Sequence, residues 1–522
     1  MLDALNQLAG GFGTILTPYN VTLIFLAGMI GTVVGALPGL GPSAGIALML
    51  PLAAGMDHAS GLSLLTGVYM GTMYGGRITS ILINTPGDAP AIITALEGYP
   101  MMQRGRGGIA LGISAFSSFI GGMFGLAVLI FFAPVVARNA IFLGPPEYFL
   151  LMLLGLSTIV LLAGEDMLKA LLMVCFGVLV STIGADYISG YVRFAPMPEL
   201  IEGIDFVAII IGLYGLGEVF HNLEHRVVLK LGKPSLRVAD YVPSRADLRE
   251  AGAPTVRGSL MGTVIGILPG AGATIATFLS YALEKKLSKT PENYGKGEIA
   301  GLAAPEASNN ASVPGSLIPL ITLGIPGSGG TAIMLGALIM FGLQPGPLLM
   351  IKSGDVVWAM IAGLVLANVF LLLSNILLIP LFVNLLRGIQ GVLASVVIAL
   401  CVVGAFSLAY STFNIWIALI FGVIGYLMRK NDYPTGPFIL AVVLAPLAEN
   451  YFRQSVMLGQ GRMAIFWERP ISVTIIGAMI AAIMLTLGLR LLMRRRRAAL
   501  QSDATTTPRP TPETKNPTEE AE

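Results

Sequence analysis

The chain has 522 residues, of which 55% are hydrophobic and 11% are charged, and its formal net charge is +2. Soluble domains carry about 25% charged residues, so this composition excludes an ordinary soluble enzyme. The balanced charge gives no reason to expect nucleic acid as a partner, and we predict none. We predict an all-α polytopic membrane protein in a lipid bilayer, with about 10–14 transmembrane segments of roughly 20 residues each.

The first predicted membrane half, residues 1–220, contains two places where Pro and Gly interrupt an apolar run. Leu37-Pro38-Gly39 ends one run, and Asn84-Thr85-Pro86-Gly87 ends the next. Proline removes a backbone donor and ends a helix, while glycine permits the positive φ of a tight turn. The apolar arm that follows, residues 89–95, is too short to cross a hydrocarbon core about 30 Å thick. We therefore predict broken helices and a re-entrant hairpin in this half.

Residues 221–258 separate the two halves and form the longest polar stretch before the C-terminal tail. They carry seven Lys and Arg against four Asp and Glu. An excess of basic residues marks loops on the cytoplasmic side of a membrane. We therefore predict a basic cytoplasmic connecting loop.

The second predicted membrane half, residues 259–497, repeats the breaks of the first. Residues 262–272 match residues 31–41 at eight of eleven positions, and residues 315–327 align with residues 75–87. A short apolar arm again follows the second Pro-Gly pair. Two apolar halves broken at matching places are typical of secondary transporters.

The distribution of Lys and Arg predicts the orientation of the halves. No Lys or Arg precedes Arg77, whereas the second half follows a basic loop, so the halves are expected to be inverted repeats. Residues 494–497 are four consecutive arginines, which predict a cytoplasmic C-terminus; binding to acidic lipids is the alternative role for them. Residues 498–522, rich in Thr, Pro and Glu, are predicted to be a disordered cytoplasmic tail.

The breaks are predicted to form the binding site, because backbone groups freed inside a membrane must face protein or a water-filled cavity. The N–H groups at the start of a half-helix suit a carboxylate, while freed carbonyls suit a hard cation such as Na⁺. A kinked helix with glycines for packing is the alternative at any single break, and four matching breaks favour a site. The predicted substrate-binding residues are Asn84, Thr85, Pro86, Gly87, Asn309, Asn310, Pro326, Gly327 and Ser328. The predicted coupling-ion residues are Gly39, Gly41, Ser43, Gly270, Gly272, Thr274 and Glu306.

Few ionisable residues accompany the breaks, and each is a functional candidate at membrane depth. Arg77 and Glu97 are expected to lie at the interface with their charges reaching water, and Asp88 also flanks a break. Glu306 is expected either to carry a coupling proton or to pair with a basic residue such as Arg77. For Asn309 and Asn310, hydrogen bonding between helices is the alternative to substrate binding.

Enzyme chemistry has little support in the sequence. The three histidines form no Ser–His pair and no His/Cys cluster within the apolar runs. We therefore predict no enzyme activity, no cofactor and no metal other than a transported Na⁺.

The chain resembles the large membrane subunit of the tripartite tricarboxylate transporters, the TctA family. The stretches that carry the resemblance include Gly35-Ala-Leu-Pro-Gly-Leu-Gly-Pro42, Asn84-Thr-Pro-Gly87, Gly212-Leu-Tyr-Gly-Leu-Gly-Glu218, Pro305-Glu-Ala-Ser-Asn-Asn310 and Gly324-Ile-Pro-Gly327. The resemblance as a whole extends over nearly the entire chain, up to the four arginines at 494–497.

The resemblance implies a multi-pass permease of the bacterial inner membrane that works with a small membrane subunit (TctB-like) and a periplasmic solute-binding protein (TctC-like). Such a system imports a carboxylate, either a tricarboxylate such as citrate or a related di- or monocarboxylate, using a Na⁺ or H⁺ gradient. The scarcity of intramembrane acids favours Na⁺, and Glu306 favours H⁺. An ion channel or a non-transporting membrane scaffold is the alternative function.

Overall fold

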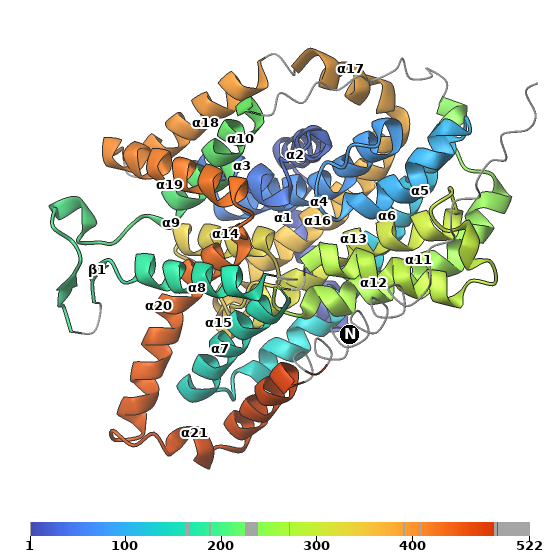
Figure 1. The fold of residues 1–522 in the computed structure, drawn as a ribbon. Coiled ribbons are helices and arrows are strands. Elements are labelled where there is room, and N and C mark those ends of the chain that lie inside the picture. Colours follow the sequence, from blue (N-terminus) through green and yellow to red (C-terminus); the bar gives the residue numbers. More distant parts are fainter. Residues whose placement is uncertain are drawn as a thin grey trace, which may run out of the picture.

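The computed structural model describes residues 2–162, 166–186, 189–224, 238–270, 272–389, 392–407, 410–484 and 488. Regular structure in these residues is almost entirely helical, and β1 (Gly184–Ala185) and β2 (Val192–Arg193) form an antiparallel pair (Figure 1). The prediction of an all-α polytopic membrane protein is confirmed. Residues 225–237 of the predicted connecting loop, the arginines 494–497 and the predicted tail lie outside the described residues.

The labels of the elements follow chain order. Those before the connecting loop are α1 (Leu2–Ile15), α2 (Pro18–Ala36), α3 (Pro42–Ala54), α4 (His58–Ile83), α5 (Ala91–Gln103), α6 (Gly107–Ala140), α7 (Pro145–Leu162), α8 (Met167–Ser181), the 3₁₀ turn η1 (Pro198–Leu200), α9 (Phe206–Ile210), the π-helical η2 (Ile211–Leu216) and α10 (Gly217–Glu224). Those from residue 238 on, of which η3 and the first part of α11 lie within the predicted connecting loop, are η3 (Val238–Tyr241), α11 (Arg245–Ile267), α12 (Gly272–Leu287), η4 (Pro291–Asn293), α13 (Ile299–Leu323), α14 (Gly329–Met340), α15 (Pro347–Lys352), α16 (Gly354–Leu377), α17 (Ile379–Ile389), α18 (Leu393–Ser407), α19 (Thr412–Lys430), α20 (Thr435–Leu458) and α21 (Ile465–Glu468).

Among the described residues, six helical segments are long and apolar enough to cross a membrane, judged by length and composition alone. They are α2, α6, the continuous segment Phe206–Glu224, α16, α19 and α20. Shorter apolar helices, including α3, α8, α14 and Pro470–Met484, accompany them. The long helices α4 and α13 are rich in Gly, Ser, Thr and Pro, yet both are buried along almost their whole length. Their polar side chains therefore face protein, which lets these helices form the centre of the molecule.

Parallel helix pairs packed through glycine form the core of each half. In the first half, a Cβ at Gly31 would lie 2.9 Å from the Cα of Gly71, and a Cβ at Gly75 would lie 2.7 Å from the Ala36 nitrogen. These contacts advance together along α2 and α4, so the two helices run in the same direction. α11 and α13 pack in the same way in the second half. Small residues let two helix backbones approach closely. In lipid the hydrophobic effect does not drive helices together, so this close packing helps to hold the pair.

Two of the half-helices that follow the breaks return toward the end from which they came. α3 returns beside α4, where a Cβ at Gly61 would lie 3.0 Å from the Ala53 carbonyl oxygen. α12 returns beside α11, where the Arg257 guanidinium pairs with the Glu284 carboxylate at 2.6 Å. The α2–α3 and α11–α12 units are therefore helical hairpins with their tips at the breaks.

The other two half-helices, α5 and α14, continue past the breaks. α5 ends beside the segment that precedes α13, where a Cβ at Gly297 would lie 3.1 Å from Met101 Cγ. α14 ends beside the start of α4, where the rings of His58 and Phe341 lie 5.3 Å apart. The arms predicted from the sequence are these two helices, of 13 and 12 residues. Each spans about 18–20 Å at 1.5 Å per residue, so each is a half-span.

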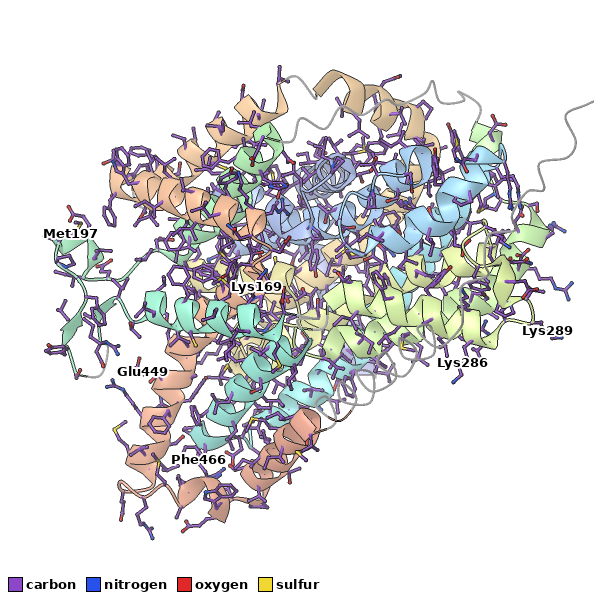
Figure 2. The ribbon with its side chains drawn as sticks, in the orientation of Figure 1. Lys169, Met197, Lys286, Lys289, Glu449 and Phe466 are labelled. Atoms are coloured by element: carbon purple, nitrogen blue, oxygen red, sulfur yellow. The ribbon has the colours of Figure 1, made fainter. Side chains whose placement is uncertain are left out.

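The two ends of the molecule carry different features, and we name them from these. The hairpin end carries β1, β2 and the last turns of α14 and α20, and there Arg193 pairs with Glu449 at 3.0 Å. The loop end carries η3 and the starts of α6 and α11, where Arg106 pairs with Asp247 at 2.8 Å. Figure 2 labels Met197 near the hairpin end and Lys289 near the loop end.

Candidate functional site

The two breaks of the first half are tied to each other by a backbone hydrogen bond. Gly39 donates its N–H to the carbonyl of Gly87 over 3.0 Å. Asn84 ends α4 in the left-handed region, with φ 54°, which redirects the chain so that Gly87 returns against α2. A Cβ at Gly87 would overlap the carbonyl oxygen of Gly35 and lie 2.7 Å from the Cα of Gly76. Glycine is required there because backbone surrounds it on both sides.

The breaks of the second half have the same arrangement. Gly270 donates its N–H to the carbonyl of Gly327 over 3.1 Å. Gly324 ends α13 with φ 73°, as Asn84 ends α4. A Cβ at Gly327 would lie 2.7 Å from the carbonyl oxygen of Gly266. The sequence repeat is therefore also a repeat of the structure around the breaks.

The breaks of different halves meet at the start of α3 and α14. A Cβ at Gly329 would lie 2.9 Å from Ser43 Oγ and 3.6 Å from the Tyr214 hydroxyl. Ser328 Oγ shares a hydrogen bond of 2.9 Å with the hydroxyl of Tyr69 on α4. The structure thus brings together Ser43 and Ser328, which lie 285 positions apart in the chain (328 − 43).

The helix ends at the breaks place opposite partial charges side by side. Within the described residues, α3, α5, α12 and α14 begin at a break, and α2, α4, α11 and α13 end at one. Unpaired N–H groups make the start of a helix partly positive, and unpaired carbonyls make its end partly negative. The arrangement can therefore hold an anion and a cation close together.

The predicted residues of the Asn84–Gly87 break have different exposures. Asn84 is exposed, Thr85 and Pro86 are half-buried, and Gly87 is buried. The Thr85 hydroxyl donates to the carbonyl of Ile83 over 3.2 Å. In the corresponding break, Pro326 and Gly327 are buried and Ser328 is half-buried. Of these residues, Asn84, Thr85 and Ser328 therefore combine a polar side chain with at least partial exposure.

The predicted Asn309 and Asn310 lie within α13 and not at the break that follows it. Asn309 Nδ2 donates to the carbonyl of Met73 on α4 over 3.5 Å, and Asn310 Nδ2 donates to the carbonyl of Glu306 over 3.2 Å. The Oδ1 atom of each is buried and receives no hydrogen bond from a described residue. Hydrogen bonding between helices thus accounts for one nitrogen of this pair and for neither oxygen.

The glycines predicted to bind the coupling ion keep their places at the breaks, but the Gly39 carbonyl is already engaged. Arg429 Nη2 donates to it over 3.4 Å, and Arg429 also pairs with Glu218. Gly270 and Gly272 adopt positive φ, of 77° and 58°. The remaining predicted residues are half-buried Gly41 and Ser43 at the start of α3 and half-buried Thr274 in the first turn of α12.

Glu306 lies in a buried polar cluster between α4, α5, α6 and α13. Its carboxylate accepts hydrogen bonds from Thr94 and from Ser118, the latter at 3.0 Å. The guanidinium of Arg77 interacts electrostatically with it and donates to Ser114 Oγ over 3.1 Å. Arg77 and Glu306 form no ion pair within 4.0 Å, so the expected pairing is reduced to an electrostatic interaction at longer range, and a coupling proton on Glu306 stays a prediction.

The expectation that Arg77 and Glu97 reach water at the interface is wrong. Their exposed fractions are 1% and 0%. Arg77 lies over the ring of Tyr74, 4.8 Å from its centroid. Glu97 accepts hydrogen bonds from the amides of Gly297 and Glu298 and from the hydroxyl of Tyr281 at 2.8–2.9 Å. Local sequence does not reveal the burial of Glu97, because the groups that cover it come from the other half of the chain.

Sequence reasoning missed the side chains that surround Ser43 and Ser328. Tyr69 comes from the middle of α4, Tyr214 from η2, and the pair Glu218–Arg429 from α10 and α19. Tyr214 lies beside Ser43 and Thr435. The π-helical segment could have drawn notice, because such segments are rare and frequent at functional sites. Arg429 directly follows an apolar run, and in the sequence such an arginine indicates only the end of a membrane-spanning helix.

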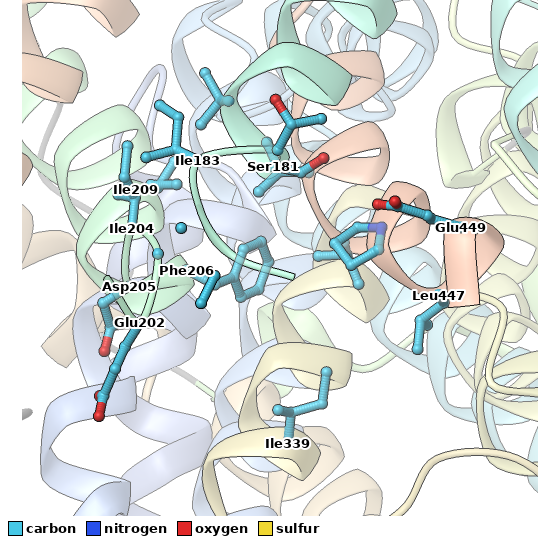
Figure 3. Close-up of a pocket in the computed structure, with 18 of the residues that line it drawn as sticks. Ser181, Ile183, Glu202, Ile204, Asp205, Phe206, Ile209, Ile339, Leu447 and Glu449 are labelled. Atoms are coloured by element: carbon cyan, nitrogen blue, oxygen red, sulfur yellow. The ribbon is translucent and has the colours of Figure 1, made fainter. Parts of the chain in front are cut away.

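A cavity of about 700 Å³ lies at the hairpin end, away from the breaks. Its lining includes Phe206 and Ile339 and a charged group from the hairpin and α20 (Figure 3). In that group Arg453 pairs with both Asp186 and Glu449 at 2.6 Å. The cavity borders the last turns of α14, the helix whose N-cap is Ser328. Among the described residues, no group of three or more His, Cys, Asp or Glu could hold a metal ion.

The long apolar helices, the broken helices and the half-helix ends define a multi-pass membrane protein with the framework of a transporter. The chain belongs to the Tripartite tricarboxylate transporter TctA family, which it matches over residues 21–440. It is 37% identical over 488 residues to an uncharacterized 52.8 kDa protein in the TAR-I ttuC' 3' region of Agrobacterium vitis, spanning 93% of this chain and 97% of that protein. It is 34% identical over 226 residues to an uncharacterized protein in the TAR-II ttuC' 3' region of the same organism, spanning 43% and 93%. No solved structure matches the chain.

Proposed function

We propose that this chain is the permease subunit of a secondary transporter that imports carboxylates, supplied by a solute-binding protein, with a cation gradient. The observation that carries the proposal is the meeting of α3 and α14, from different halves, at Ser43 and Ser328–Gly329. Two partly positive helix starts and three hydroxyls, those of Ser43, Ser328 and Tyr69, suit one carboxylate group of a tricarboxylate such as citrate or of a smaller acid.

The driving cation is Na⁺ or H⁺ in this proposal. The ends of α2, α4, α11 and α13 provide carbonyls next to the anion site, so bound cation and carboxylate would stabilise each other. That mutual stabilisation is a physical basis for coupling, since neither charge is easily bound alone at low dielectric. Asn84 and Thr85 would contribute to the substrate or the cation at the first-half break.

The proposed membrane is the bacterial inner membrane, with the two halves (residues 1–220 and 259–497) inverted relative to each other. Three contacts support the inversion: α3 and α14 approach the hairpin end, whereas α12 approaches the loop end. The basic composition of residues 221–258 and the lysines in the last turn of α12 support a cytoplasmic loop end. The tail, residues 498–522, would also be cytoplasmic.

In this orientation the hairpin end faces the periplasm. The solute-binding protein would deliver the carboxylate there, and the small membrane subunit would pack against the outer helices. Alternating access would come from movement of the half-helices against the remaining helices, since α5 and α12 lead to one end and α3 and α14 to the other.

The test uses vesicles reconstituted with the permease, the small subunit and the binding protein, with uptake of labelled citrate and of smaller carboxylates measured under a cation gradient. Ser328→Ala and Tyr69→Phe should each lower uptake about tenfold, the effect of losing about 1.4 kcal/mol of binding. Tyr148→Phe is the matched control, because it removes a buried tyrosine hydroxyl bonded to the Ala140 carbonyl at 3.1 Å, away from the breaks.

Wild-type uptake in the Ser328 and Tyr69 variants would contradict the proposed carboxylate site. Flux without the binding protein and without a gradient would instead identify a channel, and absence of flux for every carboxylate would leave a scaffold. Replacing Na⁺ with choline at fixed pH separates Na⁺ from H⁺ as the driving ion.

A further inference from the structure

The two halves carry different side chains at corresponding positions beside the breaks. With the offset of 240 that aligns residues 75–87 with 315–327, Asp88 corresponds to Ser328 (88 + 240) and Tyr69 to Asn309 (69 + 240). The structure bonds Ser328 to Tyr69, across the halves. The corresponding pair across the halves is Asp88 with Asn309.

Asp88 and Ser328 occupy the same local geometry. Asp88 Oδ1 accepts a hydrogen bond from the amide of Ala91 over 3.1 Å, and Ser328 Oγ accepts one from the amide of Thr331 over 3.2 Å. Both bonds span three residues and lead into a half-helix: Ser328 is the N-cap of α14, and Asp88 lies three residues before α5 begins at Ala91. The correspondence found in the sequence is therefore also one of side-chain position.

The remaining oxygens of Asp88 and Asn309 have no donor. Asp88 Oδ2 and Asn309 Oδ1 are both buried, and no described residue donates a hydrogen bond to either. Asn309 is 4% exposed. Buried acceptors without a partner are costly, and a buried ionised carboxylate is more costly still. Such groups in a native structure call for a proton or a cation that satisfies them.

Both side chains lie against one stretch of α4. Asn309 Nδ2 donates to the carbonyl of Met73, and a Cβ at Gly76 would lie 3.1 Å from Asp88 Oδ1. Met73 and Gly76 are three residues apart, so they lie on the same face of the helix. The first break supplies the neighbouring backbone, because a Cβ at Gly41 would lie 3.6 Å from Asp88 Cβ.

We propose that Asp88 Oδ2 and Asn309 Oδ1 bind the monovalent cation, a proton or Na⁺, that accompanies the substrate. This inference rests on the proposed function and assigns Asn309 to the cation and not to the substrate. The second half holds the carboxylate at the neutral Ser328 and Tyr69, and the first half holds the cation at the acidic Asp88. Carboxylate and amide oxygens are ligands that hard cations prefer.

The charged groups around Asp88 come from several elements. Glu306 on α13 interacts with it electrostatically, and Arg77 on α4 interacts in turn with Glu306. Arg429 and Glu218 pair at the neighbouring Gly39. No described basic residue lies within 4.0 Å of the Asp88 carboxylate as an ion-pair partner. No described Lys or Arg side chain therefore competes with a cation for this carboxylate.

The test compares Asp88→Asn and Asn309→Ala with two matched controls in the complete transporter. Asp57→Asn alters a carboxylate that accepts a backbone bond at the start of α4, as Asp88 does for α5. Asn375→Ala removes another buried asparagine whose side-chain oxygen and nitrogen lack partners among the described residues. Neither control residue touches a break.

Two measurements are made on each variant: the cation dependence of gradient-driven uptake, and carboxylate exchange between equal concentrations on both sides. Asp88→Asn should remove the dependence on Na⁺ or on pH, and Asn309→Ala should raise the half-maximal cation concentration about tenfold. Exchange at saturating carboxylate should fall less than gradient-driven uptake, because the side chains that hold the carboxylate are intact and only its stabilisation by the cation is lost. Binding of ²²Na⁺ to the purified complex distinguishes Na⁺ from the proton, because only a Na⁺ site retains the label.

Unchanged cation dependence in both variants would overturn the inference, even if Ser328→Ala confirms the carboxylate site. Altered cation dependence in the two control variants as well would also overturn it, because the effect would then be general. If Asp88→Asn lowers the amount of folded protein, Asn309→Ala and ²²Na⁺ binding to the remaining protein decide the outcome.

Discussion

The backbone N–H of Gly39 and the carbonyl of Gly87 are joined by a hydrogen bond of 3.0 Å, and an equivalent bond joins Gly270 to Gly327 at 3.1 Å. Each bond joins the backbone of the two breaks within one half. The positions of the half-helix starts therefore depend on how closely the backbone at Gly87 and Gly327 can approach its neighbours.

Gly87→Ala should disrupt the first-half breaks. Its Cβ would overlap the Gly35 carbonyl oxygen, and backbone cannot move aside as a flexible side chain can. We expect a loss of about 1–3 kcal/mol of stability and at least tenfold lower uptake. Thermal unfolding in detergent and uptake in vesicles measure both effects.

The control for this variant is Gly252→Ala, where nothing lies within 4 Å of the added Cβ. Alanine in the middle of helix α11 should slightly stabilise the protein. Equal behaviour of the Gly87 and Gly252 variants would show that the close approach at the break has no structural role.

Asn84 should act through its side chain as well as through its backbone conformation. Its φ of 54° favours Asn or Gly, so Asn84→Gly keeps the turn while removing the amide, and Asn84→Ala strains the turn by roughly 1–2 kcal/mol. We expect both variants to lose most of the uptake, and only Asn84→Ala to lose stability. Normal uptake by Asn84→Gly would restrict Asn84 to shaping the turn.

The pair Asn84→Ala and Pro326→Ala alters both second breaks at once. Pro326 is buried between Gly324 and Gly327, and its ring fixes the backbone where α13 gives way to α14. We expect this double variant to lose uptake of every carboxylate tested. Full uptake by it would contradict a role of the breaks in transport.

Arg77 and Glu306 should depend on each other for stability. Both are about 1% exposed, and removing one partner leaves the other charge buried without compensation. Arg77→Met and Glu306→Leu should each cost about 3–5 kcal/mol, and the double variant should cost clearly less than the sum. A double-variant cycle of thermal unfolding measures this coupling. Additive losses would mean that the two charges do not compensate each other.

Asp247 should make the stability of the start of α11 depend on pH. The hydrogen bond from the Ser244 hydroxyl, with the Arg106 guanidinium at 2.8 Å, holds the pKa of this carboxyl below its ordinary value of 3.8. A lowered folded-state pKa contributes stability above the unfolded pKa, and that stability is lost as pH falls through the folded value. Asp247→Asn should cost about 1 kcal/mol at pH 7, and its difference from wild type should vanish in strong acid.

The measurement is thermal unfolding from neutral pH down to about pH 2, because the loss begins near the reference aspartate pKa of about 3.9 and is complete only below the lowered folded-state value. Asp355→Asn, in the first turn of α16, is the control, since Asp355 forms no ion pair within 4.0 Å with a described residue. A difference for Asp247→Asn that persists unchanged in acid would exclude the carboxylate as its source.

Sequence pattern predicted much of the fold and part of the candidate site. The Pro-Gly pairs at Gly39, Gly87, Gly270 and Gly327 indicated where helices break, and the structure ends helices at those places. Which half-helix returns and which continues was not predictable, because that depends on packing between α3 and α4 and between α11 and α12. The prediction that Glu97 reaches water was wrong because its burial also depends on packing between distant segments: the groups that bury it come from the segment before α13.

By itself, the sequence determined the membrane class, the repeat and the places of the breaks, because apolar content, Pro and Gly act through local physical constraints on a chain in lipid. Only the tertiary structure decided which breaks meet. It placed Tyr69 on Ser328, enclosed Arg77 and Glu306, and left the oxygens of Asp88 and Asn309 without donors. These relationships join residues more than 200 positions apart, and they follow from helix packing, whose partners no local pattern specifies.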